Sequence, residues 1–142
     1  MREIKFRGKN EYDKWEYGTG LIQYKTGEIG ILNNFSKYGR EATEMLNRTN
    51  VIPKTLGQYT GEKDKNGKEI YEGDIAKKET FDYKNPNFRN INYAKIKYVD
   101  ELTGFFLVNK ENKIYYSLGA DKYNIEVIGN IYDNPELLED KQ

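Results

Sequence analysis

The sequence predicts a mainly β protein, with a small antiparallel β unit at the N-terminus, a small β-barrel after it and a short helix at the end. Three observations lead to this fold class. The 142 residues include thirteen Tyr, six Phe and one Trp, and aromatic side chains favour half-buried strands over helices. Thirteen Gly residues supply turn signals between short segments. Apolar residues recur at every second position in several runs, which is typical of strands with one buried face.

The first third of the chain predicts hairpins. The expected strands span residues 4–7, 14–23 and 28–32. In the second of them Trp15, Tyr17 and Leu21 occupy alternate positions. Residues 40–47 place apolar side chains at helical spacing, which predicts one or two turns of helix. A further strand ends at Pro53, since proline cannot donate a hydrogen bond to an inner ladder.

That strand end marks the expected domain boundary. We divide the chain into an N-terminal unit of residues 1–54 and a barrel unit of residues 55–142, with one compact domain as the alternative. The expected strands of the barrel unit span residues 56–60, 69–71, 72–76, 90–99, 104–108, 114–116 and 123–132. Residues 82–92 are expected to form a polar loop around Asn85-Pro86-Asn87. Asn134 and Pro135 predict a helix start, with Asn as N-cap and Pro at the first helical position.

The most patterned segment is a predicted hairpin at Asn66-Gly67, because Asn and Gly tolerate the positive φ values of tight hairpin turns. The motifs Gln58-Tyr59-Thr60-Gly61, Asp64 to Tyr71 and Glu72-Gly73-Asp74-Ile75 together resemble the central signature of the YopX family. The segments Arg2 to Gly8 and Val127 to Leu138 resemble the two ends of that family, so the resemblance runs through the whole chain. The signature residues are Gly61, Asp64, Asn66, Gly67, Tyr71, Glu72, Gly73 and Asp74.

The resemblance implies a protein encoded by phages and prophages, mostly β, with an SH3-like barrel in its second half. It implies no established activity and no functional residues that could be carried over. Residues 35–50 and 82–92 match no part of the family pattern, so features particular to this protein are expected there.

Composition excludes several kinds of catalytic site. The chain has no His and no Cys, which removes the usual general base, the thiol nucleophile and the common zinc ligands. We therefore expect no cofactor and no enzymatic activity. The N-terminus is charged from its second residue, and no stretch approaches the apolar length of a membrane span. Together with the lack of disulfides, this predicts a cytoplasmic protein without a membrane partner.

Two local clusters suggest specific sites. Residues 83–98 contain four basic side chains, no acid and interleaved aromatics, a pattern that suits a single-stranded nucleic acid. The candidate nucleic-acid-binding residues are Lys84, Arg89, Tyr93, Lys95 and Lys97. Alternatively, the run is a solvated strand face joined to a flexible loop. The 23 basic and 23 acidic residues leave a net charge of zero, so the overall charge does not require a nucleic-acid partner.

The second cluster consists of carboxylates around the predicted hairpin, Asp64, Glu69, Glu72 and Asp74, which could gather around a hard cation. Turn formation accounts for the same residues, since their spacing is not that of an EF-hand loop. A binding module for an unidentified protein partner, or for copies of itself, is thus the leading hypothesis. A nucleic-acid-binding barrel is the second, and a carboxylate-dependent metal enzyme the third.

Overall fold

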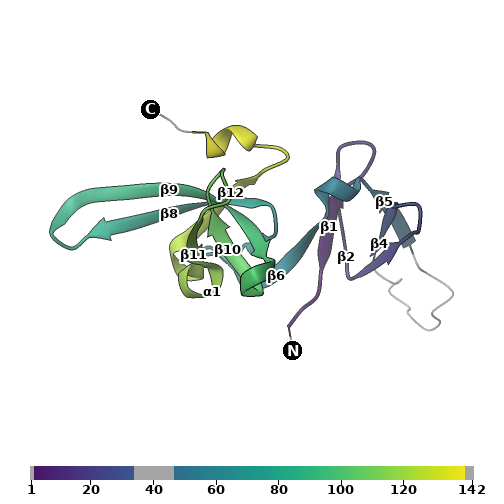
Figure 1. Ribbon diagram of the computed structural model, residues 1–142, viewed down its shortest axis with the longest axis horizontal. Coiled ribbons are helices and arrows are strands. Elements are labelled where there is room, and N and C mark those ends of the chain that lie inside the picture. Colours follow the sequence, from purple (N-terminus) through teal and green to yellow (C-terminus); the bar gives the residue numbers. More distant parts are fainter. Residues whose placement is uncertain (1, 34–46, 140–142) are drawn as a thin grey trace. The chain divides into compact units, whose positions relative to one another are not determined.

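The computed structural model describes residues 2–33 and 47–139. The described residues are mainly β, in three antiparallel sheets with one short α-helix (Figure 1). The chain divides into two compact units, residues 1–59 and residues 60–142, and the division falls within one strand, β6. We call them the N-terminal unit and the C-terminal unit.

The N-terminal unit consists of short strands joined mostly by tight turns. Its elements are β1 (Phe6–Lys9), β2 (Trp15–Gly18), β3 (Gly20–Gln23), β4 (Ile29–Asn33), β5 (Asn47–Val51), the 3-10 turn η1 (Pro53–Thr55) and the start of β6 (Gly57–Lys63). Strands β3, β4 and β5 form one antiparallel sheet, and β1 pairs with both β2 and β6. Ile31 and Val51 are the buried apolar side chains of the β3-β4-β5 sheet.

The structure corrects two expectations for this unit. The predicted strand 14–23 is two strands separated at Thr19, because Gly18 lies against the backbone of Leu32 and the N–H of Thr19 donates to the Leu32 carbonyl. Of the predicted helix over residues 40–47, residues 40–46 lie outside the described ranges, and Asn47 is the first residue of β5.

The C-terminal unit is built on a five-stranded antiparallel sheet in the order β11-β10-β9-β8-β12. Its strands are β8 (Asp74–Asp82), β9 (Asn85–Val99), β10 (Gly104–Val108), β11 (Ile114–Ser117) and β12 (Ile125–Asn130), preceded by the rest of β6 and by β7 (Glu69–Tyr71). The core contains Ile70, Ala76, Ala94, Ile96, Leu107, Leu118, Ile125 and Val127. No closed barrel is detected among the described strands.

The helical elements of this unit are single turns: η2 (Asp100–Leu102), α1 (Leu118–Asp121), η3 (Lys122–Asn124) and η4 (Pro135–Leu138). The predicted terminal helix is therefore one 3-10 turn. Asn134 and Pro135 take the expected N-cap and first positions, but the Asn134 side chain makes no capping hydrogen bond. The side-chain oxygen of Asn134 instead accepts a hydrogen bond from the N–H of Asn130, which holds the turn to the end of β12.

Four hairpin turns share one hydrogen-bonding pattern. The N–H of the first residue donates to the carbonyl of the fifth, and the N–H of the fourth donates to the carbonyl of the first. The first residues are Asn10, Tyr24, Asp64 and Asn109; the fourth are Asp13, Gly27, Gly67 and Asn112, and each of the fourth has a positive φ. The predicted turn at Asn66-Gly67 is one of them, with the positive φ at Gly67 alone.

In three of these turns the side chain of the first residue adds two more bonds. An oxygen of Asn10, Asp64 or Asn109 accepts from the backbone N–H groups two and four residues later. Such Asx side chains substitute for a backbone acceptor, so each turn is stabilised by its own first residue.

The largest correction concerns residues 82–92, which form strand rather than a loop. β8 and β9 pair from Ile75 opposite Lys95 to Asp82 opposite Asn85, with Tyr83 and Lys84 as the turn. The side-chain oxygen of Asp82 accepts from the N–H of Lys84 and closes the turn. We call residues 79–92, the outer half of this hairpin, the arm; it projects from the rest of the C-terminal unit (Figure 1).

Candidate functional site

The arm is the most exposed regular structure of the described chain. Every residue from 81 to 91 is exposed, although all but the two turn residues belong to strands. Four of these residues are large and apolar: Phe81 is 59% exposed, Tyr83 101%, Phe88 55% and Ile91 42%. Phe81 lies directly opposite Arg89, and the guanidinium carbon of Arg89 lies 5.6 Å from the centre of the Phe81 ring.

The base of the arm is firmly anchored. Lys78, opposite Asn92, is 5% exposed, and its ammonium lies 3.2 Å from the centre of the Tyr116 ring on β11. A cation over an aromatic face is attracted by the negative charge of that face, more strongly when water is excluded. The outer strands therefore extend from a packed base.

The predicted nucleic-acid-binding residues fall on one face, with one exception. Strand residues alternate between faces, so Arg89, Tyr93, Lys95 and Lys97 of β9 share the face opposite the buried Ala94 and Ile96. Lys84 lies in the turn at the end of the arm.

The shared face is not an open groove along its whole length. Tyr93 and Lys95 are half-buried, whereas Arg89 and Lys97 are exposed. Tyr93 lines a hollow of about 240 Å³ together with Leu137 and Leu138 of η4, so η4 covers the middle of the row.

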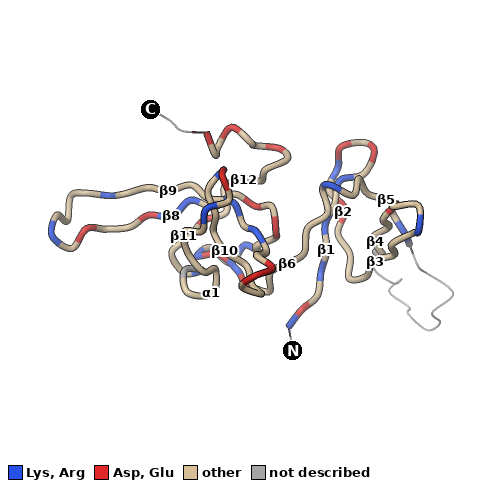
Figure 2. Tube along the Cα trace, in the orientation of Figure 1, with Lys and Arg blue, Asp and Glu red and all other residues tan. Residues whose placement is uncertain are grey.

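Charges on and near this face are partly neutralised. Lys77, opposite Tyr93, forms an ion pair of 3.0 Å with Glu79. Their hydrogen bond raises the pKa of Lys77 and lowers the pKa of Glu79. Burial lowers the pKa of Lys95, and the neighbouring ammonium of Lys97 lowers it further. On the arm, the acidic residues lie on β8 and the basic residues lie at the turn and on β9 (Figure 2).

Of the predicted carboxylate cluster, Asp64 serves the fold. One oxygen accepts from the N–H groups of Asn66 and Lys68, and the other accepts at 2.9 Å from the N–H of Val127 on β12. Burial raises the pKa of Asp64, but these three backbone donors outweigh burial and leave the pKa below its usual value.

The other signature residues also shape the backbone. Asp74 is 2% exposed and accepts from the N–H of Tyr71 at 2.8 Å, which closes the turn through Gly73, where φ is +90°. Glu69 lies within bonding reach of the Tyr71 hydroxyl, Glu72 is half-buried, and Gly61 has a positive φ. Within residues 2–33 and 47–139, no three carboxylates gather as ligands for a metal ion.

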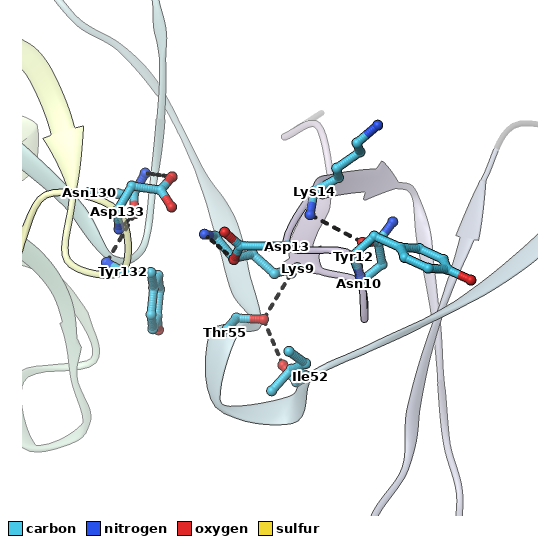
Figure 3. A network of polar contacts seen from close by, with 10 residues as sticks. All are labelled: Lys9, Asn10, Tyr12, Asp13, Lys14, Ile52, Thr55, Asn130, Tyr132 and Asp133. Carbon is cyan, nitrogen blue, oxygen red and sulfur yellow. Dashed lines mark hydrogen bonds and ion pairs between the residues drawn. The ribbon is translucent and has the colours of Figure 1, made fainter.

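The N-terminal unit contains a polar network that the sequence did not reveal. The hydroxyl of Thr55 accepts from the N–H of Lys9 at 2.8 Å and donates to the carbonyl of Ile52, which ties η1 to β1 (Figure 3). Asn10 and Lys14 of the first hairpin turn appear beside it, and the ammonium of Lys9 pairs with Asp13 at 2.7 Å.

The close-up also shows Asn130 of the C-terminal unit, whose oxygen accepts from the N–H groups of Tyr132 and Asp133.

A second hollow of the C-terminal unit, about 320 Å³, is lined by Glu62, Phe105 and Phe106 among others. Glu62 forms an ion pair of 2.8 Å with Lys122, so its carboxylate is engaged in the fold. No helix in the described part of the chain is long and apolar enough to cross a bilayer.

Comparison with known proteins agrees with the pattern of the central hairpin. Residues 5–139 match the family model described as YopX protein. The chain is also similar to a solved structure, "Crystal structure of protein EF1440 from Enterococcus faecalis", at 26% sequence identity and a TM-score of 0.55, which covers 96% of this chain and 98% of that chain. No curated protein shows a significant match. The resemblance predicted from the sequence is thereby confirmed, and this chain belongs to the YopX family.

Proposed function

We propose that this chain is a non-enzymatic, phage-type accessory protein that acts in the cytoplasm and binds another protein through its arm. The observation that carries the proposal is the exposure of Phe81, Tyr83, Phe88 and Ile91 on a strand pair that projects from a packed base. Burying one large apolar side chain contributes about 1.5–3 kcal/mol. Exposed apolar groups gathered on one projecting element are typical of an interaction surface.

Composition supports a binding role over a catalytic one. A chain without imidazole or thiol lacks the side chains that most often act as general base and nucleophile near neutral pH. The absence of cysteine also suits a reducing compartment.

The strand order supports an SH3-like architecture for the C-terminal unit. β8, β9, β10 and β11 follow one another as an antiparallel meander, single helical turns follow β11, and β12 returns to pair with β8. An SH3-like barrel has this order of elements, and the arm then extends the loop between its first two strands.

Site-specific cross-linking in full-length protein tests the binding role. A photoreactive amino acid replaces Phe88 in one variant and, as a matched control, replaces Tyr123, which is 75% exposed on η3 of the same unit. We expect a discrete cross-linked protein from the arm position in cells that express the chain, and its loss when Phe81 and Tyr83 are changed to Ser. Equal products from both positions, or none from Phe88, would contradict the proposal.

Nucleic acid is the second candidate, favoured by the shared face of Arg89, Tyr93, Lys95 and Lys97. If Lys84, Arg89 and Lys97 each contact one phosphate of a single strand, affinity should fall about 20-fold between about 50 and 200 mM salt. Fluorescence anisotropy with labelled single- and double-stranded DNA and RNA measures this. Absence of binding at about 50 mM salt removes this candidate.

A further inference from the structure

The outer half of β9 has a pairing strand on one side only. β9 pairs with β8 from Arg89 to Lys95 and again at Asn85, whereas it pairs with β10 only from Lys95 to Val99. Within the described sheet, β8 and β10 are the two neighbours of β9, so residues 85–92 present one strand edge to solvent. Backbone N–H and C=O groups along such an edge can pair with another extended strand.

From Arg89 to Asn92 this edge carries little of the usual protection against pairing. Proteins protect edges with lysines, prolines or bulges. Residues 85–92 contain Pro86 next to the turn and a single charge, Arg89. The register shift after Phe81 leaves residues 86–88 of β9 without a partner on β8, so the regular part of the β9 edge begins at Arg89. The corresponding stretch of β8, residues 79–82, carries two acids, whereas residues 89–92 carry none. The β9 edge is therefore the better pairing surface.

The composition of the edge fits a second copy of the same chain. The arm contains Glu79 and Asp82 against Lys84 and Arg89, so two arms carry no net charge that would repel. Positions 85, 87, 90 and 92 are all Asn, whose amide both donates and accepts hydrogen bonds and is thus complementary to itself. A polyanion would instead require an excess of cations, which the arm lacks.

We propose that two copies of this chain pair their β9 strands antiparallel over residues 88–92, around a two-fold axis at Asn90. This inference rests on the proposed binding role of the arm and names its partner. The register places Phe88 opposite Asn92 of the copy and Arg89 opposite Ile91 of the copy, so the two arginines do not face each other. Five paired residues on each strand make a small interface, and we expect a weak dimer that forms as concentration rises.

A single-cysteine scan tests the register directly, since the chain has no cysteine of its own. Each full-length variant carries one thiol at a position from 87 to 92, and Thr80→Cys, opposite Asn90 on β8, is the matched control. Residues opposite each other in antiparallel strands have Cβ atoms about 4.5–5.5 Å apart, near disulfide geometry. We expect the fastest interchain disulfide at Asn90→Cys, with slower reaction on either side. Equal rates along the scan, or a faster reaction at Thr80→Cys, would overturn the proposal.

Sedimentation equilibrium of the full chain supplies a second measurement without a new covalent bond. Asn90→Lys places a like charge on both edges, and we expect it to weaken the dimer at least tenfold, whereas Thr80→Lys leaves it unchanged. A chain that stays monomeric at every concentration refutes self-pairing. The binding of another protein through the arm is then still decided by the cross-linking experiment. Cross-linking to a different protein that Asn90→Lys abolishes, without self-association, would refute self-pairing and support the proposed function.

Discussion

Replacement of Asp64 tests whether one carboxylate joins two distant parts of the C-terminal unit. Its side chain closes the turn after β6 through Asn66 and Lys68 and binds the N–H of Val127, 63 residues later in the chain. Asn109 makes the same two turn bonds without a third, long-range bond. Comparing substitutions of Asp64 and Asn109 therefore separates the stability that comes from the turn bonds from the stability that comes from the long-range bond.

Asp64→Ala should cost considerably more stability than Asn109→Ala. Loss of the exposed turn bonds of Asn109 resembles loss of a helix cap, about 1 kcal/mol. Asp64→Ala also leaves the buried N–H of Val127 without its acceptor, which adds about 1–3 kcal/mol. The expected difference is about 2 kcal/mol, equivalent to about 8–16 °C in Tm for a unit of this size.

The same carboxylate predicts a pH dependence. The pKa of Asp64 is lower in the folded protein than in the unfolded chain, so the folded structure stabilises the charged carboxylate. Its contribution to stability is therefore present above the unfolded pKa, near 3.8, and is lost as pH falls through the lower folded pKa. Asp64→Ala should remove this part of the acid sensitivity.

Urea unfolding followed by far-UV circular dichroism measures the difference, and hydrogen exchange of the Val127 amide reports the long-range bond directly. Equal destabilisation by Asp64→Ala and Asn109→Ala would refute the reasoning. If Asp64→Ala does not fold, Asp64→Asn keeps one acceptor oxygen and should fall between the wild type and the alanine variant.

Three further predictions concern single side chains. Thr55→Val should cost about 2 kcal/mol, because it leaves the buried N–H of Lys9 without an acceptor, whereas Thr55→Ser should not; the fluorescence of the single tryptophan during urea unfolding measures both. Gly67→Ala should cost about 1 kcal/mol from backbone strain alone, since φ is +83° and no atom lies within 4 Å of the added methyl group; thermal unfolding measures it. Lys97→Gln should raise the pKa of Lys95 towards its usual value, because it removes a neighbouring ammonium, and an NMR titration of the lysine side chains measures the change.

Much of the strand content follows from local pattern. Alternation and turn residues predict β4, β7, β10 and β11 to within a residue or two, since each is short and bounded by strong turn signals. The turn after β6 is predicted for the right reason, a glycine with positive φ. Asn10, Asp64 and Asn109 each begin a turn of the same kind and are followed three positions later by Asp, Gly or Asn. This sequence pattern is present in all three turns, but it is recognised as a turn signal only once the turns are compared in the structure.

The arm was missed because its local signals favour a loop. Asn85, Pro86 and Asn87 disfavour strand in most contexts, and Pro86 cannot donate to a ladder. These costs are small here, because the register shift between Asn85 and Arg89 leaves Pro86 and Asn87 without a partner on β8. Pairing with β8 then overrides local propensity.

The proposed site shows what alternation can and cannot predict. The shared face of Arg89, Lys95 and Lys97 follows from their odd spacing on one strand. The cover that η4 places over Tyr93 depends on a segment more than forty residues later, and the exposure of Phe81 and Phe88 depends on how far the hairpin extends beyond the sheet. Both are tertiary features with no local signal.

Backbone groups in the body of each unit find their hydrogen-bond partners within the chain, whereas those on the outer edge of the arm are available to a partner. In the body of each unit, side chains such as Thr55, Asp64 and Asp74 bind backbone groups that sheet pairing leaves over. Along residues 85–92 no strand pairs with the outer edge in the described sheet, and each bond formed there would contribute about 0.5–1.5 kcal/mol to association instead of to folding. Substitutions in the body should therefore lower stability and binding together, whereas substitutions on the arm should weaken association and leave the unfolding free energy nearly unchanged.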